Sequence, residues 1–133
     1  MAIILDADVI IQAERGIFDL SRWLAAHPDE QLAVAAVTVA ELWHGLERAT
    51  GKYRATRLAY LQHVLEALTV APYTETTALQ HARIWAALES SGNMIGYYDL
   101  IVAATALERG GAVATFNVRH FTQVRGLKVI KPT

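Results

Sequence analysis

Short apolar runs alternate with longer stretches of helical periodicity along the chain. The apolar runs at residues 3–5, 32–37, 69–71, 112–115 and 127–130 are apolar on both faces and predict buried strands. Apolar residues three and four apart predict helices over 7–14, 18–26, 38–49, 53–68, 74–89 and 98–109, with one helical turn at 117–121. Strands and helices that alternate in this way are typical of a parallel sheet covered by helices, so we expect an α/β fold.

Boundary signals add detail to this prediction. Thr38 and Glu41 have the spacing of a capping box, with Thr38 as the N-cap residue of the third helix. Gly51 is predicted to stop that helix, and Gly110-Gly111 to stop the helix over 98–109. Because the chain contains no repeat or linker, we expect one domain over residues 1–133.

Composition narrows the class of protein. The chain is 53% hydrophobic and 19% charged, which favours a folded core over disorder. It contains no cysteine, which excludes disulfides, thiolate zinc sites and cysteine nucleophiles and suits a cytoplasmic location. No signal peptide or membrane-spanning stretch is predicted. The net charge is −1, so any nucleic acid must be bound by a local basic patch or with the help of a metal ion.

Polar residues follow the predicted strands, where the ligands of open α/β sheets bind. Asp6 and Asp8 follow the first strand, Glu41 lies in the first turn after the second, and Asn117 follows the strand at 112–115. Asp99 opens the most apolar helix. We therefore expect these residues to meet at one edge of the sheet, although they are far apart in sequence.

Each of these residues also has a structural explanation. Asp8 and Asn117 are suited to cap helices, Glu41 to complete the capping box, and Asp99 to interact with a helix dipole. Only Asp6, which closes a buried strand, has no predicted cap to make. Burying several unpaired carboxylates together is unfavourable unless a cation neutralises them. A site of oxygen ligands without cysteine or paired histidines favours Mg²⁺ or Mn²⁺ over Zn²⁺.

Gly45 lies one turn after Glu41, on the same face of the predicted helix. A glycine at this position leaves space beside the carboxylate, at a cost of about 1 kcal/mol in helix stability. Close packing between helices explains it equally well.

Four segments resemble the motifs of the PIN-domain ribonucleases, and among these the VapC-type toxins. They are residues 4–11 (ILDADVII), 38–45 (TVAELWHG), 99–106 (DLIVAATA) and 115–121 (TFNVRHF). The third segment is the most specific of the four. The segments occur in the family's order and span nearly the whole chain.

The resemblance implies a three-layer α/β/α domain that cleaves RNA with Mg²⁺ or Mn²⁺. It implies Asp6, Glu41 and Asp99 as the catalytic, metal-binding acids, with Asn117 completing the site. It also implies a homodimer and an antitoxin protein that blocks the site. The RNA target stays open, and so does the number of metal ions.

Two positions depart from the family pattern. Asp8 stands where many relatives have Asn or Ser, so it either ligates the metal or only caps a helix. Asn117 and His120 stand in the fourth motif, where many relatives have an acid. The basic residues that could guide an RNA backbone, although most of them are expected to be solvated surface, are Arg48, Lys52, Arg54, Arg57, Arg119 and Arg125.

Two alternative functions remain at this point. Asp6-Ala7-Asp8 after a strand also matches the nucleophile motif of haloacid-dehalogenase-like phosphatases, with Asp6 as nucleophile and Asp8 as general acid/base. The chain is short for that fold, and its only adjacent acidic pair comes early, at residues 29–30. The second alternative is a non-catalytic binding module of the same fold, which the neutral Asn117 would suit.

Overall fold

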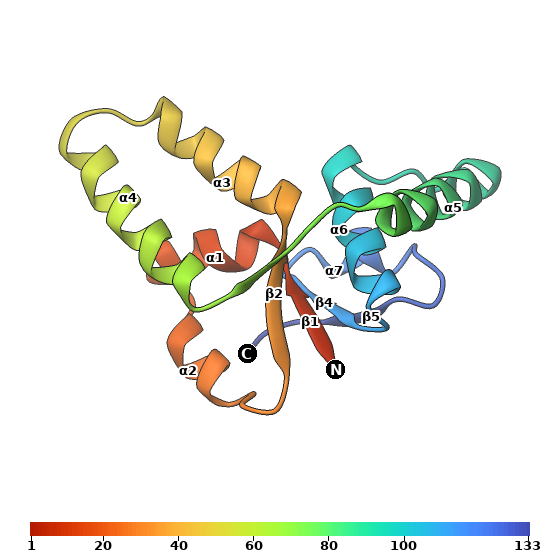
Figure 1. Ribbon diagram of the computed structural model, residues 1–133, viewed down its shortest axis with the longest axis horizontal. Helices are drawn as coiled ribbons and strands as arrows, with labels where there is room; N and C mark the ends of the chain where they lie inside the picture. The colour runs from red at the N-terminus through yellow and green to blue at the C-terminus, as the bar shows by residue number, and fades with distance from the viewer.

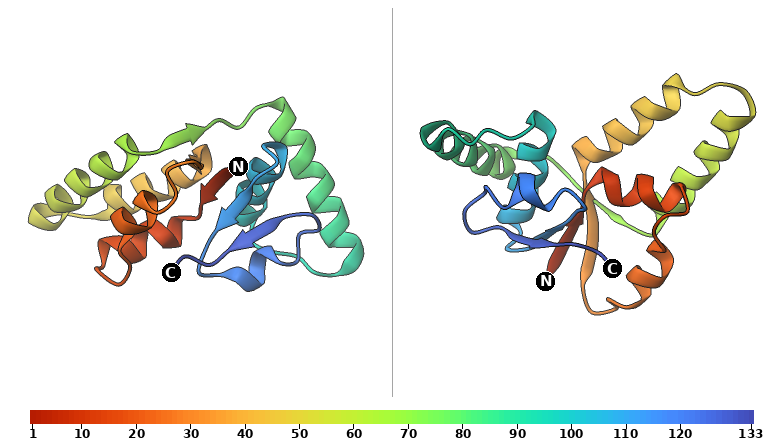
Figure 2. Two further views of the ribbon diagram at one scale, coloured as in Figure 1. Left: turned by 90° about the horizontal axis from the view of Figure 1, so that it is seen from below. Right: turned by 180° about the vertical axis from the view of Figure 1, so that it is seen from behind.

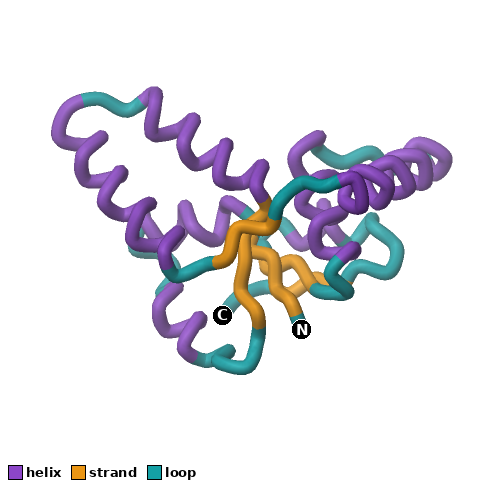
Figure 3. The backbone as a smooth tube through the Cα atoms, viewed as in Figure 1, coloured by secondary structure: helices purple, strands orange, loops and turns teal.

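Five parallel strands form the centre of the computed structural model, which describes residues 1–133. Their order across the sheet is β3-β2-β1-β4-β5. Figure 3 shows the strands in orange at the centre of the molecule, with the helices in purple around them. The strands are β1 (Ala2–Leu5), β2 (Gln31–Ala35), β3 (Thr69–Ala71), β4 (Ala112–Ala114) and β5 (Lys128–Ile130). Because all pairings are parallel, every strand ends at the same edge of the sheet, called here the carboxyl edge.

Helices cover both faces of this sheet (Figures 1 and 2). On one face lie α1 (Ala7–Glu14), α2 (Leu20–Ala25), α3 (Ala36–Arg48) and α4 (Gly51–Glu66). On the other face lie α5 (Glu75–Ser91), α6 (Tyr97–Glu108) and the single turn α7 (Val118–Phe121). The α/β/α layers predicted from the sequence are therefore confirmed.

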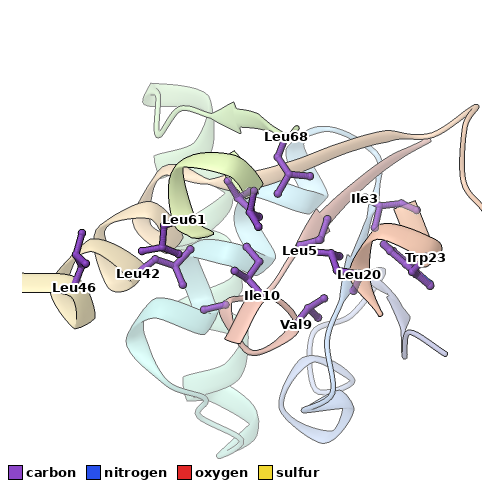
Figure 4. Packing of buried hydrophobic residues seen from close by; sticks show 14 residues of the cluster. Ile3, Leu5, Val9, Ile10, Leu20, Trp23, Leu42, Leu46, Leu61 and Leu68 are labelled. Atoms are coloured by element: carbon purple, nitrogen blue, oxygen red, sulfur yellow. The ribbon is translucent and has the colours of Figure 1, made fainter. Parts of the chain in front are cut away.

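The central strand supplies side chains to both layers, because successive residues of a strand point to opposite faces. Ile3 and Leu5 pack in the core under α1–α4, shown in Figure 4, whereas Ile4 packs in the core under α5 and α6. All three are at most 1% exposed. This explains why the first apolar run of the sequence has no polar alternation.

Two predicted helix boundaries are wrong. The second strand ends at Ala35, and α3 already begins at Ala36, so Ala35 rather than Thr38 is the N-cap residue. The first turn of α3 packs against the core, so Ala36 and Val37 continue the apolar run of the strand. Because no polar or glycine residue separates the two elements, the sequence does not show where the strand ends and the helix begins. Gly51 does not stop α3, which ends at Arg48; it is the first residue of α4, with φ +61°.

No helix combines the length and the apolar character that crossing a membrane would require.

Candidate active site at the carboxyl edge

Asp6 lies at the end of the central strand and is only 7% exposed. Contrary to the sequence prediction it does cap a helix: it is the N-cap residue of α1, and its Oδ1 accepts a hydrogen bond from the amide of Ala7 at 2.8 Å. Its other oxygen, Oδ2, accepts a hydrogen bond from the Thr115 hydroxyl at 2.9 Å. Both carboxylate oxygens are thus held in fixed positions.

The environment of Asp6 disfavours its charged form. Burial is the largest cause, the charge of Asp8 adds to it, and that of Asp99 contributes less, so that the pKa of Asp6 rises to about 7. The hydrogen bonds from Thr115 and Ala7 oppose this rise only in part. A nearby cation would reverse the balance, because an opposite charge favours the ionised carboxylate.

Asp8 is the second residue of α1, in its first turn, and does not cap the helix, since the N-cap position belongs to Asp6. Its Oδ2 accepts hydrogen bonds from the Phe116 amide at 3.0 Å and from the Thr115 hydroxyl at 3.3 Å. Its Oδ1 is buried without any hydrogen-bond partner. Burial raises the pKa of Asp8, and the hydrogen bond from Phe116 is the main opposing effect. Asp8 therefore ties α1 to the end of β4 and offers one free oxygen.

Thr115 is the residue of this site that the sequence analysis did not single out. It is fully buried just after β4, and its hydroxyl contacts both Asp6 and Asp8 and accepts a hydrogen bond from the Asn117 amide at 2.9 Å. Its position directly after an apolar strand and two residues before Asn117 is the only feature of the sequence that could have indicated a role in the site. A threonine in such a run is, however, also a common strand residue.

Replacing Thr115 with valine tests this role. Valine keeps the shape but removes the donor to Asp6, so the pKa of Asp6 should rise further and the carboxylate should lose its fixed orientation. If the site cleaves RNA with a metal ion, as the resemblance in the sequence implies, cleavage should fall about 10- to 100-fold, the usual range for a side chain that orients a metal ligand. Steady-state cleavage rates would measure this, with Thr115→Ser as the control that restores the hydroxyl. Equal rates for the valine variant and wild type would contradict it.

Glu41 lies in the second turn of α3, because the helix begins earlier than the sequence predicted. The predicted capping box is therefore absent, and the hydroxyl of Thr38 is buried without a hydrogen-bond partner. Glu41 is partly exposed and forms no hydrogen bond or ion pair. Burial and then the charge of Asp99 raise the pKa of Glu41. The structural explanation proposed for Glu41 is thus removed.

Asp99 lies in the first turn of α6, as predicted, with its side chain 26% exposed. Its Oδ2 lies 3.1 Å from Nδ1 of His120, which belongs to α7. Because its charge raises the pKa of both Asp6 and Glu41, Asp99 is electrostatically coupled to the acids after β1 and after β2. Asp99 therefore links three segments that are far apart in sequence.

Asn117 lies beside these acids, but its side chain is not engaged with them. It occupies the N-cap position of α7 without a side-chain capping bond, and it is exposed. Its backbone amide bonds to Thr115, and hydrogen bonding from this amide lowers the pKa of Asp8. The structure thus places Asn117 at the same edge, with a free amide side chain.

Gly45 does not leave space beside Glu41. A Cβ atom at Gly45 would lie 3.1 Å from the guanidinium of Arg57, so the glycine lets α4 pack this side chain against α3. Arg57 is also 3.5 Å from Glu14, and Arg54 pairs with Glu47 at 3.2 Å. Two members of the densest basic cluster are therefore already paired with acids.

The chemistry of the donors fits a hard divalent cation. All the candidate ligands offer oxygen donors, carboxylates from the acids and an amide oxygen from Asn117. One carboxylate oxygen, in Asp8, is buried without a partner, and the charge of Asp99 opposes those of Asp6 and Glu41. No three acidic or histidine side chains form a ready-made metal cage in the structure. A cation at this edge would draw the acids together by neutralising their repulsion.

Comparison with known proteins identifies the family. Residues 3–127 match the PIN domain model, and the chain belongs to the PIN-domain family. The chain is 30% identical over 131 residues to Ribonuclease VapC1 of Rickettsia felis, covering 98% of this chain and 96% of that protein. It is 35% identical over 136 residues to VapC ribonuclease Y4jK of Sinorhizobium fredii, with the same coverage of 98% and 96%.

Solved structures agree with this assignment. VapBC2 of Rickettsia felis, bound to a promoter DNA fragment, superposes with a TM-score of 0.90 over 100% of both chains, and its 19% identity supports the shared fold. VapBC-5 of Mycobacterium tuberculosis, a toxin–antitoxin system, superposes with a TM-score of 0.77 at 30% identity over 98% of both chains. Neither the phosphatase nor the non-catalytic module is supported by these findings.

Proposed function

We propose that this chain is a divalent-metal-dependent endoribonuclease and the toxin of a toxin–antitoxin pair. The observation that carries the proposal is the coupling of Asp99 to both Asp6 and Glu41 at the carboxyl edge of a PIN-domain fold. These acids come from three separate elements and have no cationic partner other than His120. Relatives named as VapC ribonucleases match nearly the full chain, which supports the choice of RNA as substrate.

Asp6, Asp99 and Glu41 would hold Mg²⁺ or Mn²⁺, with Asp8 and Asn117 as further oxygen donors. The bound ion would lower the pKa of a water molecule and stabilise the negative charge that develops on the phosphate. Thr115 fixes the orientation of Asp6, and the amide of Phe116 fixes that of Asp8. The chain thus contributes preformed hydrogen bonds that orient Asp6 and Asp8.

The partners follow from the same assignment. Solved relatives that are toxin–antitoxin systems support an antitoxin as the partner of this chain. Such an antitoxin would block the acidic edge. A homodimer, a cytoplasmic location and a single domain over residues 1–133 complete the proposal. The exposed aromatic residues on α5, α6 and the segment before α5 are available for such contacts; they are Tyr73, Trp85, Tyr97 and Tyr98.

Cleavage of a defined RNA by the purified chain tests the proposal. We expect cleavage with Mg²⁺ or Mn²⁺, loss of cleavage with a chelator, and recovery when excess metal is returned. Mapping the ends of the fragments would show internal cuts and would locate the target sequence. Cleavage that is unaffected by the chelator, or no cleavage of any cellular RNA under any metal condition, would refute it.

A further inference from the structure

A hollow opens directly beside Asp99, between the segment that precedes α6 and the turn α7. It encloses about 370 Å³, and its lining residues are Gly92, Asn93, Met94, Ile95, Gly96, Arg119, His120 and Gln123. One of them, His120, reaches Asp99 itself, with its Nδ1 3.1 Å from Oδ2. Gly96 lies close to the same oxygen, since a Cβ atom added at this position would be 3.5 Å from it. The inner wall of the hollow is therefore next to the catalytic carboxylate.

The charge of this hollow is opposite to that of the acidic site. Its lining contains no acidic residue, and it contains two basic ones, Arg119 and His120. Arg119 is exposed and forms no ion pair, whereas Arg54 and Arg57 of the cluster on α4 are paired with acids. An unpaired guanidinium next to an acidic centre is suited to bind an anion that the acids alone would repel.

A second hollow lies on the other side of α7 and shares both basic residues. It is lined by Phe116, Asn117, Val118, Arg119, His120 and Lys131, and it too has no acidic lining residue. Arg119 and His120 thus form a basic ridge between two hollows, with Lys131 beyond it. A polyanion that crosses α7 could follow this ridge from one hollow to the other and pass the carboxyl edge on its way.

We propose that the Arg119–His120 ridge binds an RNA phosphate next to the scissile one and so positions the strand against Asp99. Arg119 supplies the charge that anchors the phosphate. His120 is a positioning residue, since its Nδ1 contacts Asp99 while its Nε2 forms no hydrogen bond within the protein. This inference rests on the proposed ribonuclease function and assigns the side of the site on which the flanking nucleotide lies.

The proposal is tested by measuring the binding of a short, end-labelled single-stranded RNA to the chain. All proteins compared carry Asp6→Asn, which is expected to prevent cleavage of the RNA during the measurement. We expect Arg119→Ala to weaken binding about 3- to 10-fold at moderate salt and to lower the slope of log K against log salt by about 0.7, the value for one contact to a single-stranded phosphate. Arg119→Lys should retain the slope. Lys128→Ala removes an exposed charge at the opposite, amino end of β5 and should leave both quantities unchanged.

A methylphosphonate in the RNA identifies the contacted group. When the phosphate next to the cleavage site is made neutral, Arg119→Ala should cause little further loss, because the two changes remove the same contact. Additive losses, or an Arg119→Ala slope equal to that of Lys128→Ala, would overturn the inference. If wild type cleaves RNA with metal but the binding results for Arg119→Ala differ from those expected, only the proposed role of the ridge is refuted. If wild type does not cleave RNA at all, the proposed function itself is refuted.

An antitoxin-specific role is a separate outcome. If Arg119→Ala leaves RNA affinity and its salt dependence unchanged but weakens capture of the antitoxin, the ridge is a protein contact and the proposal is wrong.

The His120→Gln variant tests whether His120 positions the strand. The kcat for RNA cleavage should fall by a larger factor than KM rises, because Arg119 still anchors the strand while the contact with Asp99 is altered.

Discussion

RNA cleavage by the Asp99→Asn variant is expected to fall about 100-fold or more relative to wild type. Loss of an outer partner of a metal ligand already costs about 10- to 100-fold, and Asp99 is proposed to contact the metal itself. The change removes the charge that Asp6 and Glu41 both experience. Asparagine keeps an oxygen that can accept the hydrogen bond of His120, so the local geometry should survive.

The measurement is the single-turnover cleavage rate at saturating Mg²⁺, together with metal affinity from calorimetry. The matched control is Asp29→Asn, the same chemical change at an exposed residue that forms no hydrogen bond through its side chain. We expect the control to cleave at the wild-type rate. A decrease of less than about 10-fold for Asp99→Asn, with the fold intact, would remove Asp99 from the proposed site.

Asp6→Asn is expected to abolish cleavage and, in the metal-free protein, to raise stability at alkaline pH. The pKa of Asp6 is about 7 in the folded chain, against the ordinary value of 3.8 for an aspartate side chain. Between these values the folded chain keeps a proton that the unfolded chain has lost, so wild-type stability should fall as the pH rises through this window. Above pH 7 the full penalty applies, at most roughly 4 kcal/mol at 1.36 kcal/mol per pH unit.

Urea unfolding at pH 5 and pH 8, with a chelator present, measures this effect. Asparagine has no charge to desolvate, and its oxygen can still accept the hydrogen bond of the Ala7 amide. The decrease in stability between the two pH values should therefore shrink without vanishing, because the pKa values of Asp8 and Glu41 are raised as well. An unchanged pH dependence in the variant would show that burial of Asp6 is compensated in some other way.

The same experiment connects stability to the metal. Adding Mg²⁺ at pH 8 should stabilise wild type, since a cation offsets the repulsion among the acids, and it should stabilise Asp6→Asn much less. Asp6→Asn should thus be more stable than wild type in the absence of metal at pH 8, and this difference in stability should disappear when Mg²⁺ is added. A functional site of this kind lowers the free energy of unfolding, as is common where activity requires buried carboxylates.

The layers of the fold could be predicted from the sequence because the central strands, β1 and β4, are short apolar runs buried on both faces, and the strands alternate with helical stretches. The clustering of Asp6 and Asp99 could also be anticipated, from their positions at strand and helix ends. The start of α3 could not: Ala36 and Val37 are as apolar as the strand before them, and only packing decides where the helix begins. That error produced the capping box that seemed to explain Glu41.

Hydrogen bonds across the sheet were beyond the sequence. Thr115 lies 109 positions after Asp6, and nothing local indicates that its hydroxyl reaches that carboxylate. Close helix packing was one of the two explanations that the sequence offered for Gly45, and the structure supports it; only the partner, Arg57 of the next helix, could not be identified. Contacts of this kind depend on the register of distant elements, which periodicity does not encode.

The bond between Thr115 and Asp6 has a consequence for synthesis of the protein. Asp6 is synthesised 109 residues before Thr115, and β4 comes directly before Thr115. Since domains generally fold as units, a nascent chain that lacks β4 cannot orient Asp6 or complete the central sheet. RNA near the site of synthesis would therefore not meet an ordered Asp6 until β4 and Thr115 have been made.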